Sequence, residues 1–301
     1  MAICAHRAGT YSIVARDPAT GQFGVAVQSH WFSVGPLVPW ARPGVGAIAT
    51  QANVEVSYGP RALELLTAGA GGNEALAQLV AGDSAAATRQ VAIVDAHGQV
   101  AAHTGATCVP FAGHVVGEAV SCQGNLLASE GVWPAMLEAF GDGTGSLARR
   151  LLAALDAGEL AGGDARGRQS AALLVVPSSG EPWEELVSLR VEDHSAPLDE
   201  LRRLLDLHDA YALADTADGL VAEGRHAEAA GLYERASALA PDSHELAFWA
   251  GLGLAQFGQM DTALALVRQA IEWHPGWREI LERLPAEMAP AADAVRERLR
   301  A

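Results

Sequence analysis

Lysine is absent from this chain, and its absence limits the chemistry available. All 20 basic residues are arginines, against 36 aspartates and glutamates, so the formal net charge of the 301 residues is −16. An acidic field of this size repels nucleic acid and anionic lipid, so neither is expected as a partner. A catalytic lysine is excluded too, and arginine is no substitute as a base because its guanidinium stays protonated.

Cysteine is scarce as well. Cys4, Cys108 and Cys122 form neither a CxxC pair nor an even-numbered framework, so a reducing compartment fits better than secretion. The residues before Thr10 hold no apolar stretch of signal-peptide length, and no later run is long enough to cross a bilayer. We therefore expect a cytoplasmic protein that needs no disulfides, since half of its residues are apolar and can form a substantial core.

Several common catalytic motifs are also missing. The chain has no GxSxG, HExxH or Walker sequence, and the glycine-dense segment 141–146 follows a helical stretch, so it reads as a cap and turn. The ten histidines are scattered, with no pair at a metal-binding spacing. We expect neither a metal nor a cofactor.

The secondary-structure pattern of the sequence changes near residue 208. Residues 1–207 alternate short β-rich runs with glycine-rich turns, and a DPATG turn joins the first two runs into a hairpin over residues 10–29. Helical patterns lie at residues 60–68, 74–81, 132–140 and 146–157. This order, with near-continuous apolar strands such as AALLVV, predicts an α+β domain built as a four-layer αββα sandwich with the sheets inside.

Residues 208–301 are uniformly helical and contain a repeat. Gly224, Ala229, Ala236 and Pro241 recur 34 residues later as Gly258, Ala263, Ala270 and Pro275, which is the tetratricopeptide period. The alanines allow two helices to approach closely, Tyr233 fills the space between them, and a last helix is expected at 285–300. Because two units are few for a free-standing solenoid, this all-α segment is expected either to support a homo-oligomer or to bind a protein or peptide partner.

Thr10 is the candidate nucleophile. A threonine at a free amino terminus carries its own base, because an α-amine with a pKa of about 7.7–8.0 lies within reach of its hydroxyl. Such a site needs a threonine at the start of a strand, a small residue before it whose peptide bond can be cut, and donors for an oxyanion. The segment AGTYSIV supplies the first two.

Residues 10 to about 208 resemble the bacterial and archaeal family known as domain of unknown function 1028. The resemblance rests on TYSIVARDPATGQFGVAVQSH, VPWARPGVGAIATQA, SYGPR, QGNLL and GGDARGRQSAALLVV. It implies the N-terminal nucleophile hydrolase fold, with Thr10 at the nucleophile position. Nine residues precede Thr10 here, so its amine is acylated unless the Gly9–Thr10 bond is cut or translation starts elsewhere.

Arg42 is the cation that the resemblance suggests for the site. In the related proteasome subunits a lysine at the head of the third strand assists the threonine, and the comparable stretch here, WARPGVGAIAT, offers Arg42. Its charge can lower the pKa of the amine or bind a substrate carboxylate. The alternative is a surface residue at the start of a strand.

The end of the second run places polar residues beside Thr10. If the hairpin register holds, Ser29 and His30 lie next to the threonine, with His30 as a proton carrier and Trp31 as an apolar pocket wall. His30 is alternatively a structural histidine. In SCQGNLL, the amides of Gln123 and Asn125 are candidate oxyanion donors; Asn125 is alternatively a residue in a left-handed turn.

The densest charge cluster is GGDARGRQS, before the apolar strand AALLVV. Asp164 is the candidate to orient the Thr10 amine, and Arg166, Arg168 and Gln169 are candidates to bind substrate, with the arginines suited to a carboxylate. A flexible surface loop is the alternative.

These residues lead to one functional expectation and one rival. The expectation is an amide hydrolase that acts on a small amide or peptide-like substrate through an acyl ester on Thr10, after autoproteolysis before that residue. The rival is a catalytically silent scaffold in which the same fold supports an interaction module.

Overall fold

The computed structural model describes residues 9–300, apart from the side chain of His226. Cys4 and residues 1–8, on which the targeting expectation rests, lie outside the described residues. The chain divides into two compact units, residues 1–202 and 203–301, and the division falls inside helix α5 (Pro197–Ala222). Helical structure therefore begins eleven residues before the expected start at 208.

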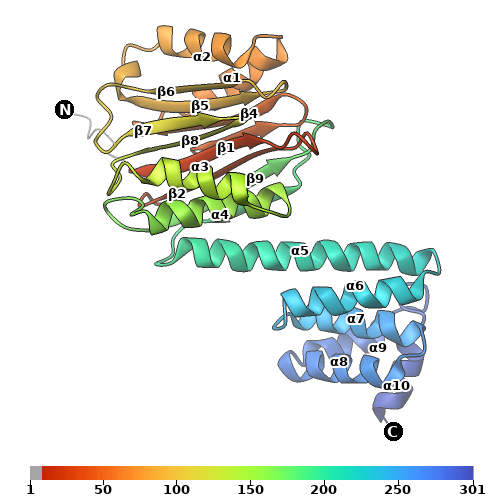
Figure 1. Cartoon of the computed structure of the whole chain (residues 1–301). Coiled ribbons are helices and arrows are strands. Elements are labelled where there is room, and N and C mark those ends of the chain that lie inside the picture. Colours follow the sequence, from red (N-terminus) through yellow and green to blue (C-terminus); the bar gives the residue numbers. More distant parts are fainter. Residues whose placement is uncertain (1–8, 301) are drawn as a thin grey trace. The chain divides into compact units, whose positions relative to one another are not determined.

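The first unit consists of two antiparallel sheets (Figure 1). The larger has the strand order β10-β9-β2-β1-β8-β7. Its strands are β1 (Thr10–Arg16), β2 (Phe23–Ser29), β7 (Gly113–Gly117), β8 (Val120–Asn125), β9 (Ser170–Val176) and β10 (Val187–Val191). The smaller has the order β3-β4-β5-β6, with β3 (Pro39–Arg42), β4 (Gly46–Ala52), β5 (Arg89–Asp95) and β6 (Val100–Thr104).

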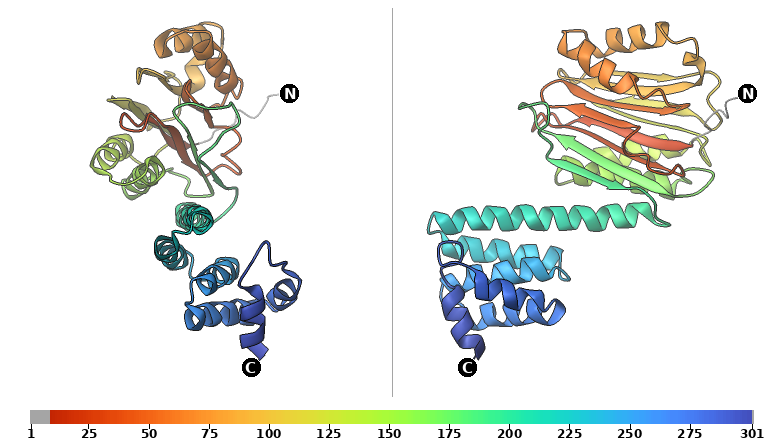
Figure 2. Two further views of the ribbon diagram at one scale, coloured as in Figure 1. Left: turned by 90° about the vertical axis from the view of Figure 1, so that its right-hand side faces the viewer. Right: turned by 180° about the vertical axis from the view of Figure 1, so that it is seen from behind.

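Two helix pairs cover the outer faces of these sheets. Helices α1 (Tyr58–Thr67) and α2 (Gly72–Ala81) pack on the smaller sheet, and α3 (Val132–Asp142) and α4 (Leu147–Leu160) pack on the larger. The left view of Figure 2 shows the sheets face to face between the helix pairs. The mixed α and β first domain, its four helical stretches and the hairpin over residues 10–29 are confirmed.

Alternation along the strands explains the burial of both sheet faces. In β1, Ser12 and Val14 face the smaller sheet, whereas Tyr11 faces α4. Valines and alanines of both sheets fill most of the space between them. The end of this interface that holds Thr10 is polar instead, and the candidate site lies there.

The second unit is all-helical and contains the repeat. Its helices after α5 are α6 (His226–Leu239), α7 (His244–Gln256), α8 (Met260–Trp273), α9 (Gly276–Arg283) and α10 (Ala292–Arg300). Gly224 and Gly258 both have positive φ, 75° and 76°, so the repeated glycine supplies the left-handed residue that ends a helix. Tyr233 is buried as expected, and its ring lies so close to Gly253 that a Cβ there would come within 2.7 Å of it.

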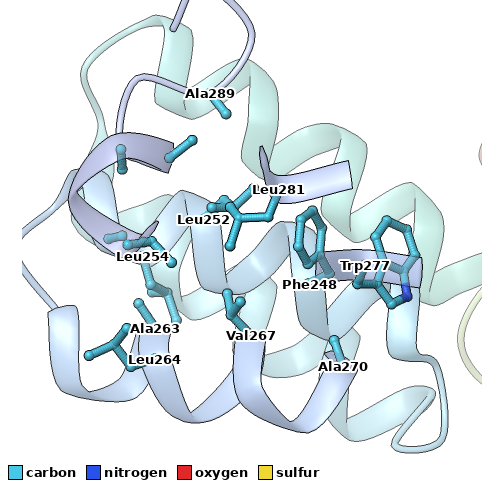
Figure 3. Close-up of a cluster of buried hydrophobic side chains, with 14 of the residues drawn as sticks. Phe248, Leu252, Leu254, Ala263, Leu264, Val267, Ala270, Trp277, Leu281 and Ala289 are labelled. Carbon is cyan, nitrogen blue, oxygen red and sulfur yellow. The ribbon is translucent and has the colours of Figure 1, made fainter. Parts of the chain in front are cut away.

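The core of the second unit centres on α7 and α8 (Figure 3). The ring of Phe248 stacks on Trp277 with centroids 4.5 Å apart, and Val267 and Ala270 of α8 are fully buried. The last expected helix, 285–300, is shorter than predicted, since α10 begins after Pro290. Among residues 9–300, no helix has the length and apolar character needed to cross a bilayer.

Candidate functional site

Thr10 opens β1 between two neighbouring strands. It lies opposite Ser29 of β2 and Asn125 of β8, and only 1% of its surface is exposed. The Thr10 Oγ1 lies 3.0 Å from Ser29 Oγ and donates to the carbonyl oxygen of Gly9 at 2.6 Å. The expected register therefore brings Ser29 into contact with the candidate nucleophile.

The carbonyl oxygen of Gly9 collects hydrogen-bond donors. Besides Thr10, the Ser29 hydroxyl donates to it at 2.5 Å and Arg166 Nη2 at 2.8 Å. The backbone N–H of Trp31 donates to Ser29 Oγ at 3.1 Å, which fixes the serine hydroxyl in this position. Hydroxyl and guanidinium donors on one carbonyl oxygen are the arrangement that stabilises negative charge developing there.

Asp164 holds the arginine in place. Its side chain is fully buried and accepts hydrogen bonds from the Arg166 backbone and guanidinium, with Nη2 to Oδ2 at 2.8 Å, and from the His30 backbone N–H at 2.9 Å. A buried carboxylate needs such a partner, because an unpaired charge there is costly. A Cβ on Gly9 would come within 2.6 Å of Asp164 Oδ1, so this approach requires glycine.

A cavity of about 370 Å³ lies beside Thr10. Thr10 and Gln51 line it together with apolar residues from the segment after β2, from the end of β4 and from the segment after β4: Trp31, Val34, Leu37, Val38, Ala52, Val54 and Val56. Ala52 has a φ of 70°, an unfavourable conformation for a residue with a Cβ. Strained residues of this kind gather at functional sites, because the surrounding structure has to hold them.

A network of neutral side chains joins the two sheets next to the Thr10 backbone. Gln51 Nε2 donates to Gln90 Oε1 at 2.8 Å and lies 3.4 Å from the Thr10 carbonyl oxygen, while Gln51 Oε1 accepts from Ser12 Oγ at 2.6 Å. Asn125 Nδ2 donates to the same Gln90 oxygen at 3.1 Å, and Gln123 Nε2 donates to Ser12 Oγ at 2.7 Å. All five side chains are buried, so their mutual hydrogen bonds compensate for lost water.

The hydrogen-bond donors observed at the Gly9 carbonyl differ from the expected oxyanion donors. The amides of Gln123 and Asn125 are engaged between the sheets, and the donors at the Gly9 carbonyl are Ser29 and Arg166 instead. Asn125 is also not the left-handed residue that the alternative proposed: it belongs to β8, and the positive φ of 51° is at Leu126.

Arg42 also differs from the expectation, because it does not lie at Thr10. It ends β3 opposite Gly46, whereas the contact with Thr10 comes from Gln51, five residues further along β4 or about 16 Å. Its Nη1 donates to Thr67 Oγ1 of α1 at 3.0 Å. Because β3 runs antiparallel to β4, the chain carries Arg42 away from the end of the sheet at which Thr10 lies.

The remaining predicted residues lie near the site in different ways. Trp31 lines the cavity, and His30 Nδ1 lies 3.3 Å from the Arg168 carbonyl oxygen. Arg168 points to Glu159 of α4, with Nε to Oε1 at 2.5 Å, and Gln169 Nε2 donates to Asp193 at 3.1 Å. Of the cluster at 162–170, Asp164 and Arg166 therefore lie at Gly9, the residue before Thr10, and Arg168 and Gln169 contact other elements.

Glu159 links Arg168 to the other face of β1. The Tyr11 hydroxyl donates to Glu159 Oε2 at 2.7 Å. Burial, and then the Glu159 carboxylate, raise the pKa of Tyr11 well above its ordinary value. The same carboxylate raises the pKa of Arg168. This chain of contacts anchors β1 to α4 at the residue that follows the candidate nucleophile.

Sequence reasoning missed Gln51 and Gln90. Each is the single amide in a largely apolar strand, GAIATQA or RQVAIVD, and an amide in a strand expected to be buried is the signal that identifies them. Among residues 9–300, no group of three or more histidine, cysteine, aspartate or glutamate side chains is arranged to hold a metal ion.

Comparison with known families gives two matches. Residues 10–201 match the model of a family of unknown function, DUF1028, and residues 220–284 match a tetratricopeptide repeat. The crystal structure of protein SPO2555 from Silicibacter pomeroyi, described as DUF1028, is similar at 35% identity and a TM-score of 0.60. The match covers 65% of this chain and 88% of that one.

Two further proteins share less. The cytochrome c-type biogenesis protein CycH of Rhizobium meliloti (strain 1021) is 34% identical over 133 residues, which are 40% of this chain and 34% of that protein. The chain thus spans about a third of the length of this curated relative. Anbu (ancestral beta-subunit) from Yersinia bercovieri matches 71% of this chain and 96% of its own at 11% identity, with a TM-score of 0.32.

Proposed function

The chain belongs to the DUF1028 family, and from that premise we propose that its first unit is an amide hydrolase of the N-terminal nucleophile type, with Thr10 as the nucleophile. One observation carries the proposal. The Thr10 hydroxyl lies 2.6 Å from a carbonyl oxygen that Arg166 and Ser29 also bind, and Thr10 lines an apolar cavity. The two facing sheets between helix pairs are consistent with this fold type.

The first step of the proposal is cleavage of the chain. Thr10 Oγ1 attacks the Gly9 carbonyl carbon, and its proton passes by way of the Ser29 hydroxyl to the Thr10 nitrogen. The C–N bond breaks as an ester forms between the Gly9 acyl group and the threonine oxygen. Arg166, held by Asp164, stabilises the oxyanion. Water then hydrolyses the ester and leaves a carboxylate on Gly9 and a free amine on Thr10.

The second step is turnover of substrate. The new amine has an ordinary pKa of about 7.7–8.0, so a part of it is unprotonated near neutral pH, and that form accepts the Thr10 hydroxyl proton. The oxygen attacks the substrate's amide carbon, the leaving amine takes the proton, and an acyl ester remains on Thr10. Water, activated by the same α-amine, hydrolyses that ester and releases the acid.

Mass spectrometry and activity assays test both steps. We expect the purified protein to contain a chain that begins at Thr10 and to hydrolyse members of a panel of small amides and lactams. The Thr10→Ala variant should stay intact and should lose turnover by at least about a thousandfold, because the nucleophile and its proton transfer are both removed. Thr20→Ala is the matched control, because Thr20 lies in the exposed turn after β1.

Equal turnover by the Thr10→Ala variant would contradict the proposal. A protein supplied already beginning at Thr10 separates the two steps, since it needs no cleavage. If this form also fails to hydrolyse any amide, Thr10 is not a hydrolytic nucleophile for these substrates.

A second candidate is a scaffold without catalysis, and the second unit favours it. A cavity of about 510 Å³ there is lined by aromatic and acidic residues: Tyr211, Tyr233, Trp249, Asp215, Asp218 and Glu245. Such a lining suits a peptide segment with basic and apolar side chains. A chain that stays intact at Gly9–Thr10 and turns over no amide favours this function.

A further inference from the structure

The cavity beside Thr10 has an unusually uniform lining. Seven of its nine lining residues are apolar, and none carries a charge. Of the two polar ones, Thr10 is the candidate nucleophile. Gln51 is engaged within the protein, because its amide nitrogen binds Gln90 and its oxygen binds Ser12. The cavity therefore provides apolar contacts for a ligand. It provides few hydrogen-bond partners and no opposite charge for a polar or charged group that is buried in it.

This chemistry limits what the cavity can hold. A charged group moved into it loses its water without gaining a partner, which is strongly unfavourable. An alkyl chain gains affinity by about fourfold for each methylene group that it buries. The volume of about 370 Å³ lies at the lower end of the range for small-molecule sites.

The position of the cavity indicates which half of an amide it receives. In an acyl-ester mechanism the acyl group stays bonded to Thr10 while the amine departs and water takes its place. An apolar cavity suits the half that stays, whereas water and the departing amine need a polar route. Ser29 and Arg166 lie on the polar side, at the Gly9 carbonyl.

We propose that the cavity lined by Trp31, Val34, Leu37, Val38, Val54 and Val56 is an acyl-binding site for an uncharged, apolar acyl group. As a substrate class this means amides of apolar carboxylic acids, and that reading rests on the proposed function of Thr10. The cavity's preference for an apolar acyl group is a binding property that is measurable without turnover.

The test measures binding and turnover separately. The probes are para-nitroanilides with acetyl, hexanoyl and glutaryl groups, the last of which carries a free carboxylate. Calorimetry measures their binding to the full-length Thr10→Ala chain, and nitroaniline release measures turnover by protein that begins at Thr10. We expect hexanoyl to bind at least about tenfold more tightly than acetyl, and glutaryl to bind no more tightly than acetyl.

Variants localise the preference to the cavity. Val54→Phe and Val56→Phe fill it from two partly buried positions and should each reduce the ratio of hexanoyl to acetyl affinity at least about fivefold. Val116→Phe is the matched control, since Val116 is exposed on β7, and should leave the ratio unchanged. Thermal melting shows whether each cavity variant is folded. The affinity ratio is interpreted only for a variant that is folded.

The outcomes separate the inference from the proposed function. Preferential hexanoyl binding without turnover supports the cavity's preference for apolar groups and contradicts Thr10 as the nucleophile for these anilides. Turnover with equal affinity for acetyl, hexanoyl and glutaryl probes supports the hydrolase and overturns the acyl site. An unchanged ratio of hexanoyl to acetyl affinity in a folded Val54→Phe or Val56→Phe variant also overturns the acyl site.

Discussion

Gly9 and Asp164 show how single residues shape the site. Without a side chain at Gly9, the Asp164 carboxylate packs against the backbone immediately before Thr10, and it positions the guanidinium that reaches the Gly9 carbonyl. Arg166 and Arg168 are two residues apart but have different partners, since Arg168 is half exposed and pairs with Glu159. The pair therefore offers a controlled comparison.

We expect Arg166→Gln to slow cleavage before Thr10 by about 10²–10³-fold, because loss of one oxyanion donor has an effect of this size. Arg168→Gln should cleave at nearly the normal rate. Mass spectrometry of newly synthesised protein over time measures both rates.

Loss of Arg166 also leaves Asp164 with a buried, unpaired charge, which is destabilising in itself. The double variant Asp164→Asn, Arg166→Gln removes that charge while the carbonyl still lacks its cation. Normal cleavage in a folded double variant would show that Arg166 plays no part.

At the scale of strands and helices, the inter-sheet amides hold the site's platform. Gln90 connects β5 to its neighbours: its Oε1 accepts from Gln51 and Asn125, and its Nε2 lies 2.8 Å from the Gly124 carbonyl oxygen. It thereby ties strands of both sheets together behind Thr10. Neutral amides suit this place because each can donate and accept in the same network.

We expect Gln90→Leu to lower the free energy of local opening around β5 and β8 by about 2 kcal/mol or more, since at least two buried donors lose their acceptor. Amide hydrogen exchange of peptides from these strands should then speed up by about thirtyfold. The control is Gln78→Leu on the exposed face of α2, which should change exchange little. Equal exchange in both variants would show that the network is not stabilising.

Local patterns predicted the elements better than the site. The hairpin over residues 10–29 was predictable, because turn residues and alternation set its register and brought Ser29 to Thr10. The path of β3, which separates Arg42 from Thr10, depends on pairing between strands that no local pattern encodes. Gln123 was assigned to an oxyanion because its partner, Ser12, is 111 residues away in sequence and becomes a neighbour only when the strands pair.

At the scale of the whole molecule, all four tyrosines share one environment. Each hydroxyl donates to a carboxylate: Tyr11 to Glu159, Tyr58 to Asp83, Tyr211 to Glu245 and Tyr233 to Asp218. Burial, reinforced by the neighbouring carboxylate, raises the pKa of every one, and that of Tyr58 to about 12. The pairs occur in both units of the chain.

These pairs predict how stability depends on alkaline pH. An unfolded tyrosine releases its proton near pH 10, whereas the folded chain keeps its tyrosine protons to higher pH. The stabilisation is therefore fully present below about pH 10 and is lost as pH rises, for Tyr58 through about 12. We expect tyrosinate absorbance of the native protein to rise well above pH 10, and that of the urea-unfolded protein to rise near it.

The Tyr58→Phe variant should remove the part of the native titration near pH 12. A native absorbance change centred at pH 10 would contradict the assigned pairs. Circular dichroism recorded in parallel distinguishes titration of the folded chain from alkaline unfolding.

The missing lysine acquires a practical meaning once Thr10 is placed at the site. Residues 10–301 contain no ε-amino group, so a cut before Thr10 makes its α-amine the single primary amine among these residues, and that nitrogen adjoins the cavity that Thr10 lines. Formaldehyde with a hydride donor ordinarily methylates the many lysines of a protein surface, and here it would add isotopically labelled methyl groups to the Thr10 nitrogen alone. Their nuclear magnetic resonance signal would report the protonation of that one nitrogen directly.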